Sequence, residues 1–202
     1  MMNEISLRGY IKDIKPSHTI GNMEYDKAFL VVDSNGIEDV VPLCFKHSSN
    51  KNKEGDLVEL KGNLRSYSMK GADGKNKVDI YVFTYFDIPE NNIINDEEIN
   101  NIINIDGRIC KLNDIRQHDN GSVSINFLLA NNIFTKNSNK KLNSYIPIVC
   151  WGETARLISS LSVGTQIKVS GAFHSRTYKK YINDNLEIRV AYEVVANSVS
   201  II

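Results

Sequence analysis

The sequence lacks the long apolar runs that a membrane-spanning chain needs. Its longest runs, such as Ala28–Val32, are far shorter than the roughly 20 residues of a transmembrane helix. The first stretch, MMNEISLRGYIKDIK, carries charges early and has no apolar core of the kind found in a secretory signal. These absences exclude a helical membrane protein and predict a soluble protein of the cytoplasm.

Cysteine and histidine are also scarce, which limits metal and redox chemistry. The three cysteines, Cys44, Cys110 and Cys150, form no C-x-x-C pair and sit among apolar residues, so we expect buried, reduced thiols. The four histidines are scattered without the spacing of a zinc site. We therefore expect no metal and no other cofactor.

Sequence motifs of catalysis are missing as well. The chain has no P-loop, no G-x-S-x-G and no paired Asp-x-Asp cluster. The stretch GADG at 71–74 fits a hairpin turn rather than a cradle for phosphate. We therefore expect a protein that is not an enzyme.

The chain has no net charge, since 24 Lys and Arg balance 24 Asp and Glu. The balance hides an asymmetry between segments. Residues 105–202 hold 12 basic and 7 acidic residues, residues 90–104 hold 4 acidic and no basic ones, and residues 1–89 are nearly neutral. A polyanion responds to local charge, so the second half is the better candidate for binding one.

Two parts of the sequence resemble each other. The aligned pairs are Gly9 with Gly107, Phe29 with Phe127, Pro42 with Pro147, Gly55 with Gly164, and Gly62 with Gly171. The separation grows along the chain from 98 to 105 to 109 residues. Insertions in the second copy explain this growth, because loops and helices accept insertions more readily than paired strands do. The sequence therefore predicts a tandem duplication.

Each copy reads as five short strands rich in β-branched and aromatic residues, separated by turn residues. In the second copy the expected strands are Asn104–Leu112, Val123–Ala130, Ser144–Cys150, Gln166–Tyr178 and Leu186–Ser200. A short helix is predicted in ETARLISSL, because its apolar residues share one helical face and Gly164 follows as a stop. In the first copy the polar KHSSNKNKEG replaces that helix.

This order of elements predicts an all-β fold of two tandem OB-fold five-stranded barrels, the second with a short helix between strands three and four. We assign residues 1–89 to a divergent first domain and residues 105–202 to the second. Residues 90–104 are acidic and rich in Asn, and we expect a linker there. Some of the isoleucines in PENNIINDEEINNIIN are expected to dock on a domain or to begin the next strand.

The second copy resembles the bacterial single-stranded DNA-binding protein family over most of Asn104–Ser200. Three phrases carry the resemblance in the correct order: NGSVSINFLLAN, IPIVCWGETA and VGTQIKVSGAFHSRTY. Arg156 departs from the family, which usually has Glu there. The family also ends in an acidic tail that recruits partners, whereas this chain ends in NSVSII, so we expect no recruitment through such a tail.

A barrel of this kind binds single strands in a groove where cations follow the phosphates and aromatic rings stack on bases. The resemblance places stacking aromatics at Tyr178 and Phe134. The candidate binding residues are Arg108, Arg116, Phe134, Lys136, Lys140, Lys141, His174, Arg176, Tyr178, Lys179, Lys180 and Tyr181 in the second copy, and Arg65, Tyr67, Lys70 and Lys77 in the first. Met69 replaces the equivalent of Tyr178, which predicts weaker stacking there.

Each candidate also has a purely structural interpretation. Exposed lysines in a hairpin can simply solvate it, and Tyr178 or Phe134 can pack on protein instead of a base. Trp151 follows the apolar IPIVC, so we expect it in the core or at the base of the helix. Phe29 and Phe127 are expected in the core.

The sequence therefore favours a non-enzymatic protein that coats single-stranded DNA during replication, recombination or the propagation of a mobile element. The resemblance implies four barrels in the assembly, which a homodimer of this chain supplies, and replication proteins are possible partners. The alternative is an OB-fold protein-interaction adaptor of a replication or conjugation complex with weak affinity for nucleic acid. Binding of RNA is a third option, because stacking does not read the sugar.

Overall fold

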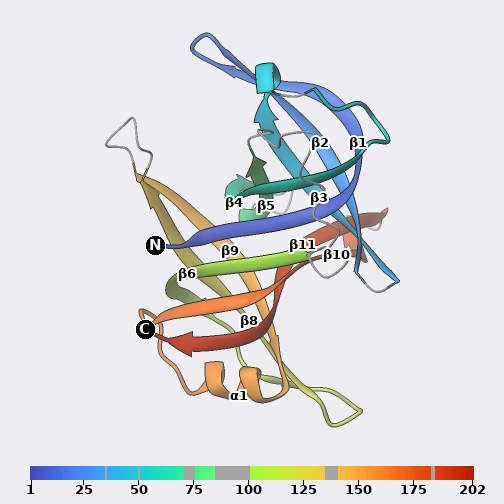
Figure 1. Cartoon of the computed structure of the whole chain (residues 1–202). Helices are drawn as coiled ribbons and strands as arrows, with labels where there is room; N and C mark the ends of the chain where they lie inside the picture. Colours follow the sequence, from blue (N-terminus) through green and yellow to red (C-terminus); the bar gives the residue numbers. More distant parts are fainter. Residues whose placement is uncertain (35, 50, 71–75, 85–100, 135–140, 183–184) are drawn as a thin grey trace.

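The computed structural model describes residues 1–34, 36–49, 51–70, 76–84, 101–134, 141–182 and 185–202. In these residues almost all regular structure is β-strand, as the sequence predicts, with one α-helix and one turn of 3-10 helix (Figure 1). The eleven described strands form a single sheet. No helix in the described part of the chain is long and apolar enough to cross a membrane.

The first half contributes five strands and the 3-10 turn. These are β1 (Asn3–Ile20), β2 (Met23–Ser34), β3 (Ile37–Lys46), η1 (His47–Ser49), β4 (Leu57–Lys70) and β5 (Asn76–Thr84). Strand β1 pairs with both β2 and β4, β2 pairs with β3, β3 pairs in parallel with β5, and β5 pairs with β4. The pairings therefore form a closed circuit that begins and ends at β1.

The second half repeats this circuit. Its elements are β6 (Asn101–Leu112), β7 (Arg116–Gln117), β8 (Val123–Phe134), β9 (Lys141–Trp151), α1 (Gly152–Ser159), β10 (Gln166–Ile182) and β11 (Asn185–Ile201). Strand β6 pairs with β8 and β10, β8 pairs with β9, and β9 pairs in parallel with β11, which pairs with β10. The predicted helix is present as α1, and its inward residues Ala155 and Ile158 are fully buried.

The glycines that recur in the two halves mark the points where strands approach closely. A Cβ atom on Gly9, Gly62, Gly107 or Gly171 would meet a backbone carbonyl oxygen of the neighbouring strand at 2.2 to 2.6 Å. Only a residue without a side chain fits at such a distance. The repeat in the sequence thus reflects a repeated backbone geometry.

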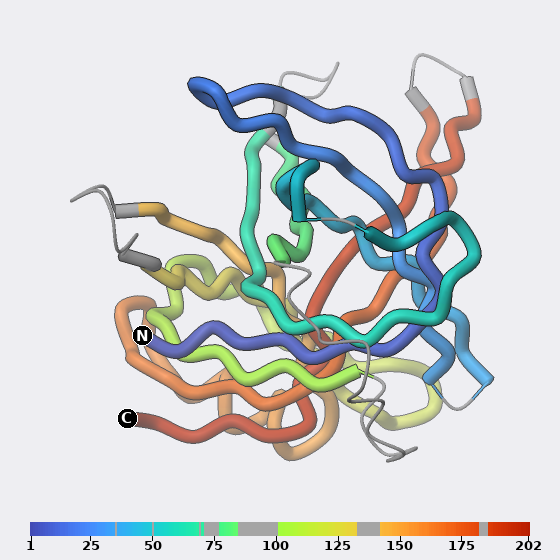
Figure 2. The backbone as a smooth tube through the Cα atoms, turned by 45° about the horizontal axis from the view of Figure 1, so that its top comes forward, coloured from blue at the N-terminus to red at the C-terminus, as the bar shows by residue number. Residues whose placement is uncertain are grey.

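Strands β1 and β6 join the two halves edge to edge (Figure 2). Asn3 lies opposite Ile105, Ile5 opposite Ile103, and Leu7 opposite Asn101. Because positions in these strands are offset by 98 residues, Ile5 faces its own counterpart, so the join has an approximate internal two-fold arrangement.

Two bonds between the halves repeat the same relation. The backbone N–H of Val40 donates to Ser175 Oγ at 2.8 Å, and the backbone N–H of Tyr145 donates to Ser66 Oγ at 2.7 Å. Val40 and Tyr145 are 105 residues apart, and Ser66 and Ser175 are 109 apart, which are the offsets found in the sequence. Each half therefore holds the other through equivalent groups.

Strand β6 begins at Asn101, three residues before the start expected from the sequence. Ile103 is fully buried and belongs to the main hydrophobic core, which contains side chains from both halves. Burial of this isoleucine draws the end of the acidic segment into the sheet. Residues 85–100 lie outside the described residues.

Candidate nucleic-acid interface

The outer face of β9 carries two exposed aromatic rings. Side chains alternate along this strand, so Ile146, Ile148 and Cys150 are fully buried while Tyr145 and Trp151 point outward. Tyr145 is 39% exposed and Trp151 is 46% exposed. Two rings on one face of a strand, with solvent above them, can stack on planar ligands.

Trp151 does lie at the base of the helix, one of the two expected places, because it is the N-cap of α1, but its ring is not in the core. Trp151 is the last residue of β9, and its position in the alternation directs the ring outward. The ring stacks on the imidazole of His118, with 5.0 Å between centroids and 28° between planes. His118 in turn shares a 2.8 Å hydrogen bond between Nε2 and Ser124 Oγ.

The face continues from β9 onto the hairpin of β10 and β11. Val149 of β9 pairs with Val195 of β11, and residues opposite one another share a face. On the hairpin, Tyr178 lies opposite Arg189. Because alternate residues along a strand share a side, Arg176, Tyr178 and Arg189 lie on the same face as Val195. One surface thus combines the rings of β9 with cations and a tyrosine of the hairpin.

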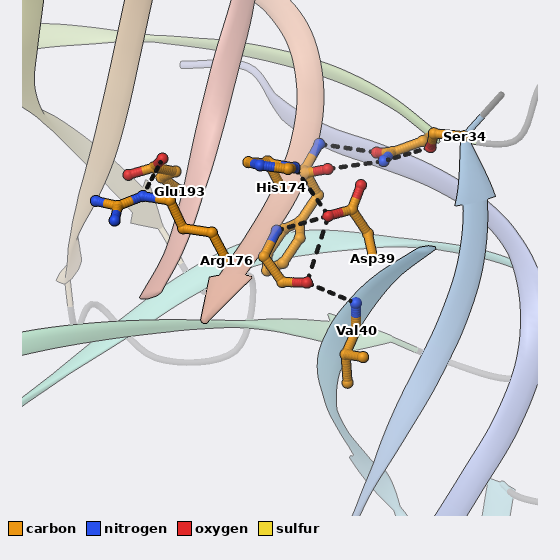
Figure 3. A network of polar contacts seen from close by, with 9 residues as sticks. Ser34, Asp39, Val40, His174, Arg176 and Glu193 are labelled. Carbon is orange, nitrogen blue, oxygen red and sulfur yellow. Dashed lines mark hydrogen bonds and ion pairs between the residues drawn. The ribbon is translucent and has the colours of Figure 1, made fainter. Parts of the chain in front are cut away.

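Ion pairs order the cations of this surface. Arg176 Nε lies 3.1 Å from Glu193 Oε1 (Figure 3). The Arg176 guanidinium lies 5.8 Å from the centre of the Tyr178 ring. The side chain of Arg176 is half exposed, whereas that of Glu193 is largely buried. Arg189 Nη2 lies 2.7 Å from Glu187 Oε2, and the hydrogen bond with this carboxylate raises the pKa of Arg189. The guanidinium of Arg176 retains donors that face solvent.

The structure divides the hairpin residues that the sequence grouped together. His174, Arg176, Tyr178 and Lys180 alternate on the outer face, whereas Lys179 and Tyr181 lie on the opposite face of the ribbon. Tyr181 is 73% exposed there, beside the exposed Leu186 with which it pairs.

Two arginines lie in line with the aromatic residues of β9, each one strand beyond the residue of β8 that pairs with the aromatic residue. Arg116 of β7 lies opposite Ser124, which lies opposite Trp151. Arg108 of β6 lies opposite Ala130, which lies opposite Tyr145. Both arginines are exposed, and Arg108 Nη1 donates to the carbonyl of Gly164 at 3.0 Å.

Four predicted residues are only partly covered by the structure. Lys136 and Lys140 lie outside the described residues. Phe134 and Lys141 pair with each other at the end of the β8–β9 ladder, and only their backbone is described. Their assignment to a binding site stays a prediction.

In the first half the predicted cations contact the protein itself. The guanidinium of Arg65 lies 3.6 Å from the centre of the Phe83 ring, and Lys77 Nζ lies 2.9 Å from Asp79 Oδ1. Tyr67 is 47% exposed and packs at a tilt on Tyr81, with 6.0 Å between centroids. Burial raises the pKa of both tyrosines. Lys70 is exposed at the end of β4.

Side chains of the first half also fill its outer face. Tyr25, Cys44 and Phe83 form a small buried cluster on that side, with Tyr81 packed against it. The imidazole of His18 stacks on Tyr25, with 4.9 Å between centroids and 8° between planes. The rings that could meet a base are therefore in contact with one another.

The thiols follow the sequence prediction in two cases of three. Cys44 and Cys150 are buried and unpaired, and burial raises the pKa of Cys150 to about 12. The prediction is wrong for Cys110, which is exposed. Cys110 directly follows the buried Ile109, so the alternation of side chains along β6 directs it outward. Among the described residues, no group of three or more His, Cys, Asp or Glu could hold a metal ion.

Sequence reasoning missed Tyr145 and Arg189, and it did not predict the exposure of the Trp151 ring. The alternation of YIPIVCW contains the signal for two of them, since every second residue from Ile146 is apolar and core-like. Arg189 could have been found only from the register of β10 with β11.

Comparison with known proteins gives three findings. No curated protein matches this chain. The structure of the wild-type single-stranded DNA binding protein from Thermus aquaticus matches with a TM-score of 0.71 and 17% identity, covering 99% of this chain and 92% of that chain. A deletion mutant of the same Thermus aquaticus protein, which also carries a point substitution, gives the same TM-score and identity and covers 94% of that chain. At this identity the likeness shows a common fold.

The third finding concerns the sequence. The model of the single-strand binding protein family matches residues 99–202, which are just over half of the chain. The matched segment contains β6 to β11 and therefore the whole outer face described above. This family consists of DNA-binding proteins without enzymatic activity. The chain therefore belongs to the single-strand binding protein family.

Proposed function

We propose that this protein binds single-stranded DNA, without catalysing a reaction, on the outer face of β9, β10 and β11. One observation carries the proposal: Tyr145, Trp151 and Tyr178 lie on the same surface as Arg176 and Arg189. Family membership and the name of the Thermus aquaticus protein, whose two structures share this fold, support it.

The chemistry of binding follows from these groups. Unpaired bases expose their flat faces, and each base that stacks on a ring contributes about 1–3 kcal/mol. Arg176 can keep its Nε on Glu193 while its outward N–H groups reach a phosphate. Stacking tolerates any base, so we expect little sequence preference.

We further propose that each half is an OB barrel and that the two arose by duplication. The two closed circuits of strand pairing, the recurring glycines and the two-fold arrangement at the β1–β6 join support this proposal. Two chains together would supply four barrels, which favours a homodimer. A role in replication, recombination or the propagation of a mobile element fits such an assembly, with replication proteins as its partners.

The first half invites a second candidate function. Its cations and rings contact other groups of the same half, as Arg65 does on Phe83 and Lys77 does with Asp79. This favours a first half that supports the assembly or contacts a partner protein, with the second half providing most of the affinity for DNA. In the extreme version of this alternative the whole chain is an adaptor.

Titration of fluorescent oligo-dT, oligo-U and a DNA duplex at two salt concentrations tests the proposal. We expect preference for the single strand, and affinity that falls as salt rises, because the release of counterions from the strand is less favourable in a more concentrated salt solution. Trp151→Ala should weaken binding by about 1–3 kcal/mol. As a control, Met69→Ala should leave affinity unchanged, because a residue without a ring provides no stacking platform.

Three outcomes of this titration would count against the proposal. Failure of the parent protein to bind oligo-dT at low salt would leave the adaptor function in its place. Equal affinity of the folded Trp151→Ala variant and the parent would remove β9 from the interface. Tighter binding of oligo-U than of oligo-dT would point to RNA.

A further inference from the structure

The hairpin that carries Arg176 and Tyr178 depends on contacts at its root. The pairing of β6 with β10 ends at Gly171, whereas β10 continues beside β11 to Ile182. At the same point β11 carries one extra residue, Asn197, opposite Ser170 and Gly171, and this bulge bends the hairpin. The direction of the hairpin is therefore set by the groups that hold the edge of β10 just beyond the bend.

Two side chains hold that edge in place of a neighbouring strand. The backbone N–H of Phe173 donates to Asn101 Oδ1 at 2.8 Å, and Asn101 Nδ2 donates to the Phe173 carbonyl at 2.8 Å. Two residues further on, the backbone N–H of Ser175 donates to Asp39 Oδ1 at 2.7 Å. Asn101 belongs to the second half itself, whereas Asp39 comes from β3 of the first half.

Asp39 is a buried carboxylate, with 2% of its surface exposed. Besides the Ser175 amide, it faces Ser175 Oγ at 3.3 Å and His174 Nδ1 at 3.0 Å (Figure 3). The backbone N–H of Val40 returns a bond to Ser175 Oγ. A buried carboxylate is tolerated only where donors surround it, so Asp39 and the root of the hairpin fix each other in one geometry.

The internal two-fold arrangement gives each position in one half a counterpart in the other, and the counterpart of Asp39 carries no charge. At the root of the β4–β5 hairpin, Ser66 accepts the equivalent bond from Tyr145. The position equivalent to Asp39, at an offset of 105 residues, is Ser144, which is buried and uncharged. The carboxylate therefore occurs only at the root of the hairpin that carries Arg176.

We propose that Asp39 is a positioning residue for the nucleic-acid interface of the second half. Through this carboxylate the first half sets the direction of the β10–β11 hairpin and so places Tyr178 relative to Tyr145 and Trp151. Tyr178 lies three residues beyond Ser175, about 10 Å along the strand, so a small rotation at the root displaces its ring. The inference rests on the function proposed above.

A double-mutant cycle tests it through oligo-dT affinity. Asp39→Ala should weaken binding about tenfold, and Tyr178→Ala should have less than its usual effect in that background, because the hairpin no longer presents the ring correctly. Asp39→Asn keeps an oxygen acceptor for the Ser175 amide and should retain most of the affinity. Additive effects of Asp39→Ala and Tyr178→Ala would overturn the proposal, since general destabilisation leaves the contribution of Tyr178 intact.

Ser144→Ala is the matched control, and it should leave the affinity of the folded protein unchanged. Hydrogen exchange of the free protein gives a readout that needs no DNA. Asp39→Ala should speed exchange at the amides of residues 176–181 and leave those of the β1–β6 join unchanged. Unchanged exchange in the hairpin would overturn the inference even if the protein binds DNA. Failure of the parent to bind oligo-dT would instead refute the proposed function, and the exchange result would still show whether Asp39 holds the hairpin.

Discussion

The two halves share a backbone plan and differ in what covers their outer faces. In the first half, Phe83 is buried on that face beneath the guanidinium of Arg65. The register of the strands places Val195 at the position in the second half that Phe83 occupies in the first. Val195 is partly exposed where Phe83 is buried, and the exposed Trp151 lies two residues along β9 from its partner Val149.

This difference shows how one strand order, present twice in a chain, can separate stability from binding. Large rings that pack on each other bury apolar surface and stabilise their own half, but they offer no platform to a base. The Trp151 ring packs on His118 yet keeps 46% of its surface exposed, so part of it remains available to a ligand. The same strand order therefore supports both uses, and side-chain size decides between them.

The largest expected effect concerns the pairing of β1 with β6, which joins the two halves. It tests whether the two halves unfold together as one unit. Ile103→Ala removes a fully buried side chain beside Ile5 and should lower the free energy of unfolding by about 2–5 kcal/mol. Because the main core includes both halves, chemical denaturation should still show one transition.

The neighbouring residue provides the control for this prediction. Ile102 is 37% exposed, and Ile102→Ala should change the unfolding free energy by less than about 1 kcal/mol. Two separate transitions, of which Ile103→Ala shifts only one, would show that the halves fold independently. The comparison would then describe two linked domains rather than one unit.

The next effect tests whether only the second face binds DNA. Tyr178→Ala should weaken binding of oligo-dT by about 1–3 kcal/mol, because a stacking ring is lost. Tyr67→Ala removes a half-exposed ring of the first half that packs on Tyr81, and it should change affinity by less than about 0.5 kcal/mol. Equal losses for the two variants would mean that both faces take part in binding.

Much of the fold could be predicted from the sequence, because positions where two strands approach closely accept only glycine, and these glycines are visible in the sequence. The recurring glycines indicated the repeat, and the helical spacing within ETARLISSL indicated α1. Some isoleucines of the Asn-rich segment were expected to begin the next strand, and Ile103 confirms this, although β6 begins three residues before the expected Asn104. Composition describes a segment on average, whereas one buried residue is enough to place a strand end.

The site was less predictable, because it depends on which side of a strand each residue occupies. Arg176 and Tyr178 lie on the outer face, whereas Lys179 and Tyr181, which the sequence grouped with them, lie on the other face. Trp151 was expected in the core or at the helix base; it is the N-cap of α1, and the alternation of β9 directs its ring outward. The contact of Arg65 with Phe83 depends on the register of β4 with β5. The contacts of Asp39 depend on how the two halves pack together. No pattern within a short stretch of sequence shows either of them.

The smallest expected effect concerns the contact between His47 and Asp26, which both lie in the first half. His47 Nδ1 lies 2.8 Å from Asp26 Oδ2, and this hydrogen bond is the main cause that raises the pKa of His47. The carboxylate of Asp26 is buried, while the imidazole is mostly exposed. A histidine whose pKa is raised on folding stabilises the folded state fully below its unfolded pKa of about 6.5. That contribution is lost as the pH rises through the higher pKa of the folded state.

Chemical denaturation at about pH 5 and about pH 8 measures this contribution. His47→Gln should lower the unfolding midpoint slightly at the lower pH and change it less at the higher pH, because glutamine can donate a hydrogen bond but cannot become charged. In an Asp26→Asn background the pH dependence of the His47→Gln effect should vanish, since the charged partner is gone. A larger loss at the higher pH would reverse the sign and exclude the His47–Asp26 pair as its cause. An effect that persists in the Asp26→Asn background would assign it to another contact of His47.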